Sequence, residues 1–239
     1  MTAGPRRWHH GRRHPPTWLL HAGRPASRWL IRRRYDVREH GTGHVPPQGP
    51  LIVAANHTGV IDGPLFAIFG PRPVHALTKE EMFRGSLGPL LRVTGQIELD
   101  RFATDLRAIR TCLHVLDRGG VVGIFPEGNR GAGDLTGFQN GAAYLALVTG
   151  APIVPLMMFG TRPKGGGKNA LPPSHGVVDL VYGAPFRVDR TPWPRTSTLV
   201  AATSEALHAR MLEELAAGLA LTGQTMPGPI PADEAKDIS

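Results

Sequence analysis

From residue 50 onward, short apolar segments alternate with segments of helical character, and this alternation restricts the fold more than any other feature of the sequence. The apolar segments are rich in Val, Ile and Leu, which is typical of strands that are buried on both faces of a sheet. We expect strands over residues 51–55, 74–79, 96–100, 121–125, 152–159 and 177–182. Strands that alternate with helices form a largely parallel sheet with helices packed on its faces, so the sequence predicts a single-domain α/β fold.

The segments between these strands carry helix signals. The clearest helix follows Thr104 or Asp105, either of which can cap its first turn, and Gly119-Gly120 ends it. Its apolar stripe consists of Leu106, Ile109, Leu113 and Leu116. Further helices are expected over residues 62–69, 140–148 and 198–221, with a short helical or turning piece over residues 85–93.

The positive charge of the chain is concentrated near its amino terminus. The chain has 27 Lys and Arg against 19 Asp and Glu, a formal net charge of +8. Residues 1–40 contain 10 Arg and 2 acidic side chains and therefore carry the whole excess, whereas 17 basic and 17 acidic side chains balance in the remainder. A basic arm of this kind favours an anionic surface as partner, either lipid headgroups or nucleic acid.

Two parts of this arm differ in composition. Residues 1–27 are rich in Arg, His, Pro and Gly, so we expect them to be disordered. The segment from Arg28 to Arg38 places Trp29 and Leu30 beside clustered Arg, which suits a short helix at a membrane interface. A solvated basic tail and an RNA contact are the alternatives, but the sequence has no zinc pattern or RNA-recognition motif, so we expect no nucleic-acid partner.

Other features limit the domain organisation and the compartment. No run of 18 or more apolar residues occurs, so no transmembrane helix is predicted. Cys112 is the single cysteine, which excludes an intramolecular disulfide and is consistent with a reducing, cytoplasmic compartment. We divide the chain into a basic arm (1–40), an α/β domain (41–222) and a loose tail (223–239).

A histidine and a carboxylate follow the first expected strand. His57 lies two residues beyond the strand, at the edge where open α/β sheets hold their ligands, and Asp62 lies five residues further on. A neutral His can take a proton from a hydroxyl, and a carboxylate on its other ring nitrogen fixes the tautomer and stabilises the imidazolium. No Ser or Cys stands beside His57, so the hydroxyl is expected to belong to a substrate. A core histidine and a helix N-cap are the structural alternatives.

Cationic side chains follow three other expected strands. Lys79 ends one strand, Arg101 follows the next, and Arg130 closes the segment Phe125-Pro126-Glu127-Gly128-Asn129-Arg130. Because the carboxyl ends of parallel strands meet at one edge of the sheet, these cations predict an anion site, and Arg suits bidentate contact with phosphate. Gly128 would let the backbone approach a ligand closely. Glu127 and Arg130 could instead form a local ion pair.

The segment Gly165-Gly166-Gly167-Lys168-Asn169 invites comparison with a phosphate-binding P-loop. It lacks the required glycine spacing and the following Ser or Thr, so the P-loop interpretation fails. We interpret residues 160–175 as a flexible loop.

Four ordered blocks together resemble the glycerolipid acyltransferase family, the 1-acyl-sn-glycerol-3-phosphate (lysophosphatidic acid) acyltransferases. The blocks are Asn56-His57 through Asp62, Gly95 through Arg101, Phe125 through Arg130, and Val154-Pro155-Leu156. The resemblance spans roughly residues 35–190, and Lys79 and the segment 138–143 match as well. Glu98, Asn129 and Gln139 depart from the residues usual in the family, which leaves the acceptor lipid open.

The resemblance implies transfer of a fatty acyl group from acyl-CoA or acyl-carrier protein to the free hydroxyl of a lysophospholipid. By default the acceptor is 1-acyl-glycerol-3-phosphate and the product is phosphatidate. His57 would be the general base and Asp62 would orient it, with no metal and no cofactor besides the acyl-thioester co-substrate. The residues assigned to substrate binding are Lys79, Arg101, Glu127, Gly128 and Arg130. The enzyme would act as a peripheral protein on the cytoplasmic face of an anionic membrane.

Two other functions use the same features. The His57–Asp62 pair could activate water, which would make the protein an acyl-thioester hydrolase. Such an enzyme has no need for cations that converge on a phosphate, and its release of CoA would not depend on an acceptor lipid. A non-catalytic protein that binds anionic membranes through residues 1–40 would tolerate loss of the His57 imidazole.

Overall fold

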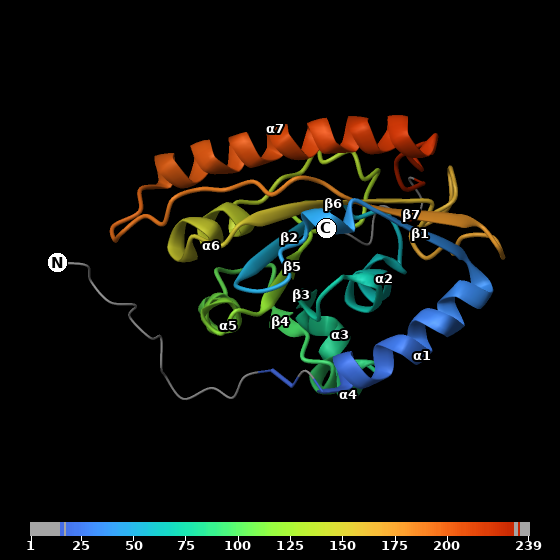
Figure 1. Cartoon of the computed structure of the whole chain (residues 1–239), viewed down its shortest axis with the longest axis horizontal. Helices are drawn as coiled ribbons and strands as arrows, with labels where there is room; N and C mark the ends of the chain where they lie inside the picture. The colour runs from blue at the N-terminus through green and yellow to red at the C-terminus, as the bar shows by residue number, and fades with distance from the viewer. Residues whose placement is uncertain (1–14, 17, 232–233, 235–239) are drawn as a thin grey trace.

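A seven-stranded sheet forms the centre of the computed structural model, which describes residues 15–16, 18–231 and 234. The strand order is β1-β7-β6-β2-β5-β3-β4. Neighbouring strands pair in parallel except β6 and β7, which are antiparallel. The strands are β1 (Asp36–His40), β2 (Leu51–Ala55), β3 (Val74–Lys79), β4 (Ile97–Leu99), β5 (Val121–Ile124), β6 (Ile153–Phe159) and β7 (Val177–Tyr182). The predicted α/β fold with a largely parallel sheet is therefore confirmed (Figure 1).

Helices cover both faces of this sheet, with α7 running along β6 on one side and α1 and α2 on the other (Figure 1). The helices are α1 (Trp18–Arg34), α2 (Asp62–Phe69), α3 (Glu80–Arg84), α4 (Gly88–Val93), α5 (Leu106–Asp117), α6 (Gly141–Thr149) and α7 (Ser197–Thr222). A single 3-10 turn, η1 (Thr42–His44), follows β1. Of the two caps proposed for α5, Asp105 is correct, since its side chain accepts from the backbone N–H groups of Arg107 and Ala108.

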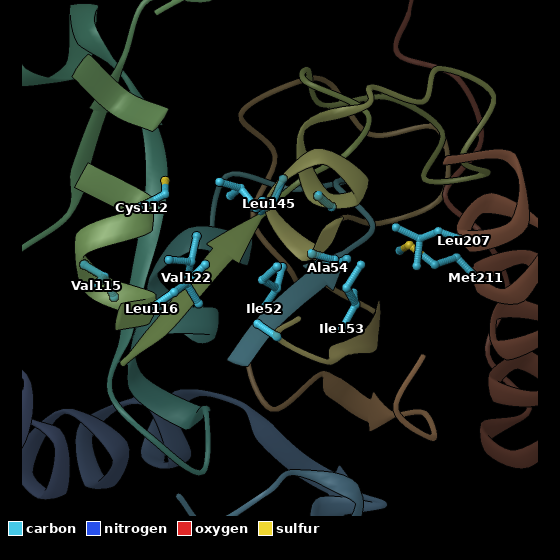
Figure 2. Packing of buried hydrophobic residues seen from close by; sticks show 14 of the residues in the cluster. Ile52, Ala54, Cys112, Val115, Leu116, Val122, Leu145, Ile153, Leu207 and Met211 are labelled. Atoms are coloured by element: carbon cyan, nitrogen blue, oxygen red, sulfur yellow. The ribbon is translucent and has the colours of Figure 1, made fainter. Parts of the chain in front are cut away.

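Side chains of β2 alternate between two hydrophobic cores. Ile52 and Ala54 face residues of α5, α6 and α7 (Figure 2). Leu51, Val53 and Ala55 face the opposite core, which α2 completes. All five residues are buried, which explains why the strand has an unbroken apolar sequence. The central position of β2 fixes the edge at which His57 leaves the sheet.

The amino-terminal segment differs from its predicted structure. Residues 18–27 were expected to be disordered and Arg28–Arg38 to form an interfacial helix, but α1 begins at Trp18 and ends at Arg34. Residues 36–40 then form the edge strand β1, which pairs with β7. Part of the basic arm is thus built into the domain. Residues 1–14, for which disorder was also predicted, lie outside the described residues.

Two arginines of α1 explain this difference. Arg24 and Arg28 both donate to the carbonyl oxygen of Ile68, and Arg28 also donates to that of Phe69 at 3.0 Å. Carbonyl groups at the end of α2 have no partner within the helix, and a guanidinium group satisfies them while favouring the negative end of the helix dipole. Arg28, from the segment expected to lie at a membrane interface, and Arg24, from the segment expected to be disordered, therefore bind α1 to α2.

The carboxyl-terminal segment was predicted to be loose, and the structure contradicts this for the residues it describes. The carbonyl oxygen of Pro227 accepts from the backbone N–H of Gly165 at 2.9 Å, and that of Gly228 accepts from Arg162. Glu234 accepts from the backbone N–H of Lys168 at 2.6 Å. The segment after α7 therefore holds the loop between β6 and β7. The remaining residues of the predicted tail, 232–233 and 235–239, are not among those described.

Candidate active site

The backbone just before His57 is fixed by the side chain of Asn56. Its amide nitrogen donates to the carbonyl oxygen of Met158 at 3.1 Å, and its carbonyl oxygen accepts from the backbone N–H of Met158 at 2.7 Å. This buried side chain takes the place of a backbone partner where β2 ends beside β6. The turn that carries His57 therefore leaves the sheet in a defined direction.

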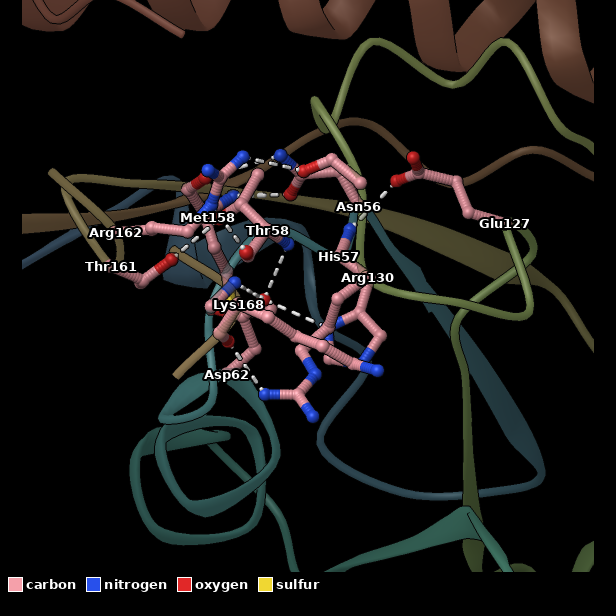
Figure 3. A network of polar contacts seen from close by, with 12 residues as sticks. Asn56, His57, Thr58, Asp62, Glu127, Arg130, Met158, Thr161, Arg162 and Lys168 are labelled. Atoms are coloured by element: carbon pink, nitrogen blue, oxygen red, sulfur yellow. Dashed lines mark hydrogen bonds and ion pairs between the residues drawn. The ribbon is translucent and has the colours of Figure 1, made fainter. Parts of the chain in front are cut away.

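His57 and Asp62 form the pair that their spacing predicted. The Nδ1 atom of His57 lies 2.8 Å from Oδ2 of Asp62. The same oxygen accepts from the backbone N–H groups of Thr58 and Gly59 at 2.7 and 2.8 Å, and Asp62 is fully buried (Figure 3). Because an ionised carboxylate only accepts, Nδ1 carries the ring proton and Nε2 has a lone pair for substrate. The side chain of His57 keeps 19% of its surface exposed, which leaves the base accessible.

The imidazole plane is held by packing as well as by the carboxylate. Phe125 stacks on the His57 ring with centroids 4.1 Å apart and an interplanar angle of 20°. The edge of Phe66, on α2, contacts Phe125 in turn. Phe125 opens the segment that contains Glu127 and Arg130, so the first and third of the four sequence blocks meet at this ring.

Glu127 contacts the turn that carries the histidine. Its Oε1 atom accepts from the backbone N–H of His57 at 2.7 Å. Burial raises the pKa of Glu127 to about 7, and the negative charges of Asp134 and Asp62 act in the same direction. The resemblance assigned Glu127 to the acceptor pocket, whereas the structure places its carboxylate on the backbone of the base. This contact is suited to fixing the turn that carries His57.

Arg130 is linked to the His57 turn through its neighbour Gly131, whose backbone N–H donates to the carbonyl oxygen of His57 at 2.9 Å. Burial lowers the pKa of Arg130, and the charge of Asp62 partly offsets that effect. Its Nη1 atom donates to the carbonyl oxygen of Lys168 at 2.8 Å and to Oδ1 of Asn169 at 3.1 Å (Figure 3). A partly buried cation beside a general base is suited to hold an anionic substrate while its hydroxyl is deprotonated.

A cavity of about 560 Å³ opens beside Arg130. Its lining consists of Lys79, Arg130, Gly167, Lys168, Asn169, Ala170 and Glu234. Burial lowers the pKa of Lys79, and the positive charges of Arg101, Arg130 and Lys168 lower it further. The predicted grouping of Lys79, Arg101 and Arg130 is therefore present in the structure, and Lys168 joins it.

Arg101 and Gly128 are not among the residues that line the cavity. The guanidinium group of Arg101 donates to Oδ1 of Asn129 and lies 3.7 Å from Glu81. Gly128 has a φ of +71°, a left-handed conformation that favours glycine, and space remains beyond its Cα. Its role in the structure is thus the turn between Glu127 and Arg130.

The sequence interpretation missed Arg162, which joins the loops around the site. Its side chain is buried and donates to the carbonyl oxygens of Thr58 at 2.9 Å, Gly131 at 2.9 Å, Gly166 at 2.6 Å and Gly228 at 2.5 Å. It follows the carboxyl end of β6 by three residues. The rule that selected Lys79, Arg101 and Arg130, a cation just beyond a strand, would have selected it too.

Among the residues that the structure describes, no group of three or more His, Cys, Asp or Glu side chains could hold a metal ion. Within the same residues, no helix is long and apolar enough to cross a membrane.

The model of the acyltransferase family matches residues 36–159, which is more than half of the chain. The chain belongs to the acyltransferase family. The matched region contains the paired His57 and Asp62 together with Lys79, Arg101 and Arg130.

Several relatives of this acyltransferase are lysophosphatidate-acylating proteins by name. The 1-acyl-sn-glycerol-3-phosphate acyltransferase of Bacillus subtilis (strain 168) is 28% identical over 191 residues, which cover 79% of this chain and 92% of the relative. The protein of the same name from Borreliella burgdorferi is 30% identical over 144 residues, which cover 57% of this chain and 55% of the relative. The crystal structure of the 1-acyl-sn-glycerophosphate acyltransferase of Thermotoga maritima superposes with a TM-score of 0.60 at 26% identity, covering 83% of this chain and 78% of the other.

Proposed function

We propose that this acyltransferase transfers a fatty acyl group from acyl-CoA or acyl-carrier protein to the free hydroxyl of 1-acyl-sn-glycerol-3-phosphate, giving phosphatidate. The observation that carries the proposal is the location of Arg130, which lines a cationic cavity while the next residue, Gly131, donates its backbone N–H to the carbonyl oxygen of His57 at 2.9 Å. A phosphorylated lipid would place its headgroup on the cations and its hydroxyl at Nε2 of His57. The relatives named above support the same acceptor.

The reaction needs one proton carrier and no acyl-enzyme. Nε2 of His57 takes the proton of the acceptor hydroxyl as the oxygen attacks the thioester carbonyl. The C–S bond then breaks, and the departing thiolate takes the proton back from the imidazolium, so an ester and a free thiol are the products. Asp62 would stabilise the imidazolium because its carboxylate is buried and lies 2.8 Å from Nδ1.

The cations would bind the phosphate of the acceptor and take no part in the bond-forming step. Arg130 and Lys79 line the cavity and would contact the phosphate directly. Arg101, which is outside the lining, would add its positive charge to theirs. Charge-assisted hydrogen bonds of this kind each contribute about 1.5–3 kcal/mol to binding.

Acyl transfer and thioester hydrolysis give different products in one assay. The purified protein is incubated with a labelled acyl-CoA or acyl-carrier protein, with and without lysophosphatidate, and both phosphatidate and free thiol are measured. Acyl transfer predicts thiol release that depends on the acceptor and equals the phosphatidate formed. Equal thiol release without acceptor, accompanied by free fatty acid, would refute the proposal in favour of a hydrolase.

We also propose that α1 lies against an anionic membrane, on the cytoplasmic face. Trp18, Trp29 and Leu30 on α1 are exposed, and the guanidinium group of Arg33 lies 4.8 Å from the centroid of the Trp29 ring. Exposed aromatic and aliphatic side chains beside Arg suit the headgroup boundary.

Vesicle co-sedimentation tests this membrane contact. The protein should bind phosphatidylglycerol vesicles more tightly than phosphatidylcholine vesicles, and Trp29→Ala with Arg33→Ala should weaken that binding. Equal binding to both vesicle types would contradict the contact with anionic lipid.

A further inference from the structure

The loop between β6 and β7 brings a lysine to the acceptor cavity. Lys168 lines this cavity together with Lys79 and Arg130. Its carbonyl oxygen accepts from Arg130 at 2.8 Å, so the position of its backbone is tied to a residue already assigned to the phosphate. The positive charge of Lys168 also acts on the pKa of Lys79. The ammonium group therefore belongs to the same electrostatic cluster.

The loop is fixed by hydrogen bonds to residues that follow α7 and by one from Arg162. Its Gly165 N–H donates to Pro227, beyond α7, and the Lys168 N–H donates to Glu234. Arg162 also donates to the carbonyl oxygen of Gly166 at 2.6 Å. These contacts place a segment that was interpreted as a flexible loop against the cavity.

Glu234 is the acidic residue of the cavity lining. Its carboxylate accepts from the Lys168 N–H at 2.6 Å. A Cβ atom at Gly167 would lie 2.1 Å from Oε1 of Glu234, so glycine at this position lets the carboxylate approach the loop. The positive charges of Lys79, Arg130 and Lys168 repel one another in this cavity, and a bound anion would reduce that repulsion.

We propose that Lys168 is a further binding residue for the acceptor phosphate and that Glu234 sets the affinity of this cavity by partly neutralising it. The inference rests on the proposed function, since it takes the acceptor to be phosphorylated. Lys168 attracts the phosphate directly. The negative charge of Glu234 repels the phosphate, while its hydrogen bond with the Lys168 N–H keeps the loop in place.

Two substitutions with opposite effects test this assignment. Lys168→Met keeps the length of the side chain and removes its charge, so the KM for lysophosphatidate should rise about tenfold or more, with the KM for the acyl donor unchanged. Glu234→Gln removes the negative charge and keeps an oxygen that can accept from the Lys168 N–H. It should therefore lower the KM for lysophosphatidate, by about twofold to fivefold.

A matched control lies in the same loop. Lys164 is exposed and is absent from the cavity lining, so Lys164→Met should keep the wild-type KM for lysophosphatidate. A second control uses a monoacylglycerol acceptor, on which Lys168→Met and the wild type should act alike because no phosphate is present. Thermal unfolding of each variant reports whether the fold is retained.

The outcomes separate this inference from the proposed function. A wild-type protein that forms no phosphatidate refutes the proposed function. A wild type that forms phosphatidate while Lys168→Met keeps the same KM for lysophosphatidate overturns the role of Lys168, as does an equal rise in Lys164→Met. A higher KM in Glu234→Gln overturns the role of its charge. Equilibrium binding of sn-glycerol 3-phosphate adds a readout without turnover, and wild-type affinity in Lys168→Met would again overturn the inference.

Discussion

Replacing Glu127 by Gln should make the protein more stable at alkaline pH. The carboxylate is buried, and its pKa is raised from 4.5 to about 7. The folded state therefore binds the carboxyl proton more tightly than the unfolded state. The stabilising contribution of the protonated carboxyl is fully present below pH 4.5 and is lost as the pH rises toward 7. A pKa change of this size corresponds to about 3 kcal/mol of unfolding free energy.

Glutamine removes this titration without removing the contact. Its side-chain oxygen can still accept from the backbone N–H of His57, which Glu127 does at 2.7 Å. The unfolding free energy of Glu127→Gln, relative to the wild type, should therefore increase by up to about 3 kcal/mol between pH 4.5 and pH 8. Glu205→Gln on the exposed side of α7 is the matched control and should change little over this range.

Urea unfolding followed by circular dichroism across this pH range measures the effect. The wild type and Glu127→Gln should approach one another at low pH and diverge as the pH rises. Parallel profiles, or a Glu127→Gln protein that is less stable than the wild type at pH 8, would refute the argument that burial of the Glu127 carboxylate costs stability.

Two further substitutions test the geometry around the base. Asp62→Asn should lower kcat by about 10²- to 10⁴-fold, because the neutral amide neither stabilises the imidazolium nor fixes the tautomer; a loss of less than about tenfold in an acyl-transfer assay would contradict this. Gly59→Ala should lower both kcat and melting temperature, because its Cβ atom would lie 2.5 Å from the backbone oxygen of Thr161. Gly63→Ala is its control, since nothing lies within 4 Å of a Cβ atom there, and calorimetry showing equal destabilisation by both would argue against the clash.

The central strands could be predicted from the sequence, whereas the polar edge strand could not. β2 is buried at all five positions, so its apolar sequence follows from its place in the sheet. β1 has one buried side chain, Val37, among charged and polar neighbours. Its strand structure comes from pairing with β7, a contact between residues about 140 positions apart in the chain. The local sequence pattern does not predict a pairing between strands so far apart in the chain.

The pairing of His57 with Asp62 could be predicted because their spacing is local, but the loops around them depend on tertiary contacts. His57 and Asp62 lie within one turn, and strand ends place Lys79 and Arg130 near them. The contribution of Lys168 depends instead on hydrogen bonds to Arg130 and Glu234, which come from distant parts of the chain. Similarly, the sequence pattern of α1 does not distinguish an arginine that binds helix carbonyl groups from one that faces lipid.

The most direct test of the account is the rate of phosphatidate formation by His57→Ala, measured together with its affinity for lysophosphatidate. His57 is the proposed base, and separate cations are proposed to hold the phosphate. We therefore predict that His57→Ala forms phosphatidate about 10³-fold more slowly or worse, while its affinity for lysophosphatidate stays close to that of the wild type. Arg130→Met should instead mainly weaken binding, with the affinity for lysophosphatidate reduced about tenfold or more. Turnover by His57→Ala at the wild-type rate would contradict the account.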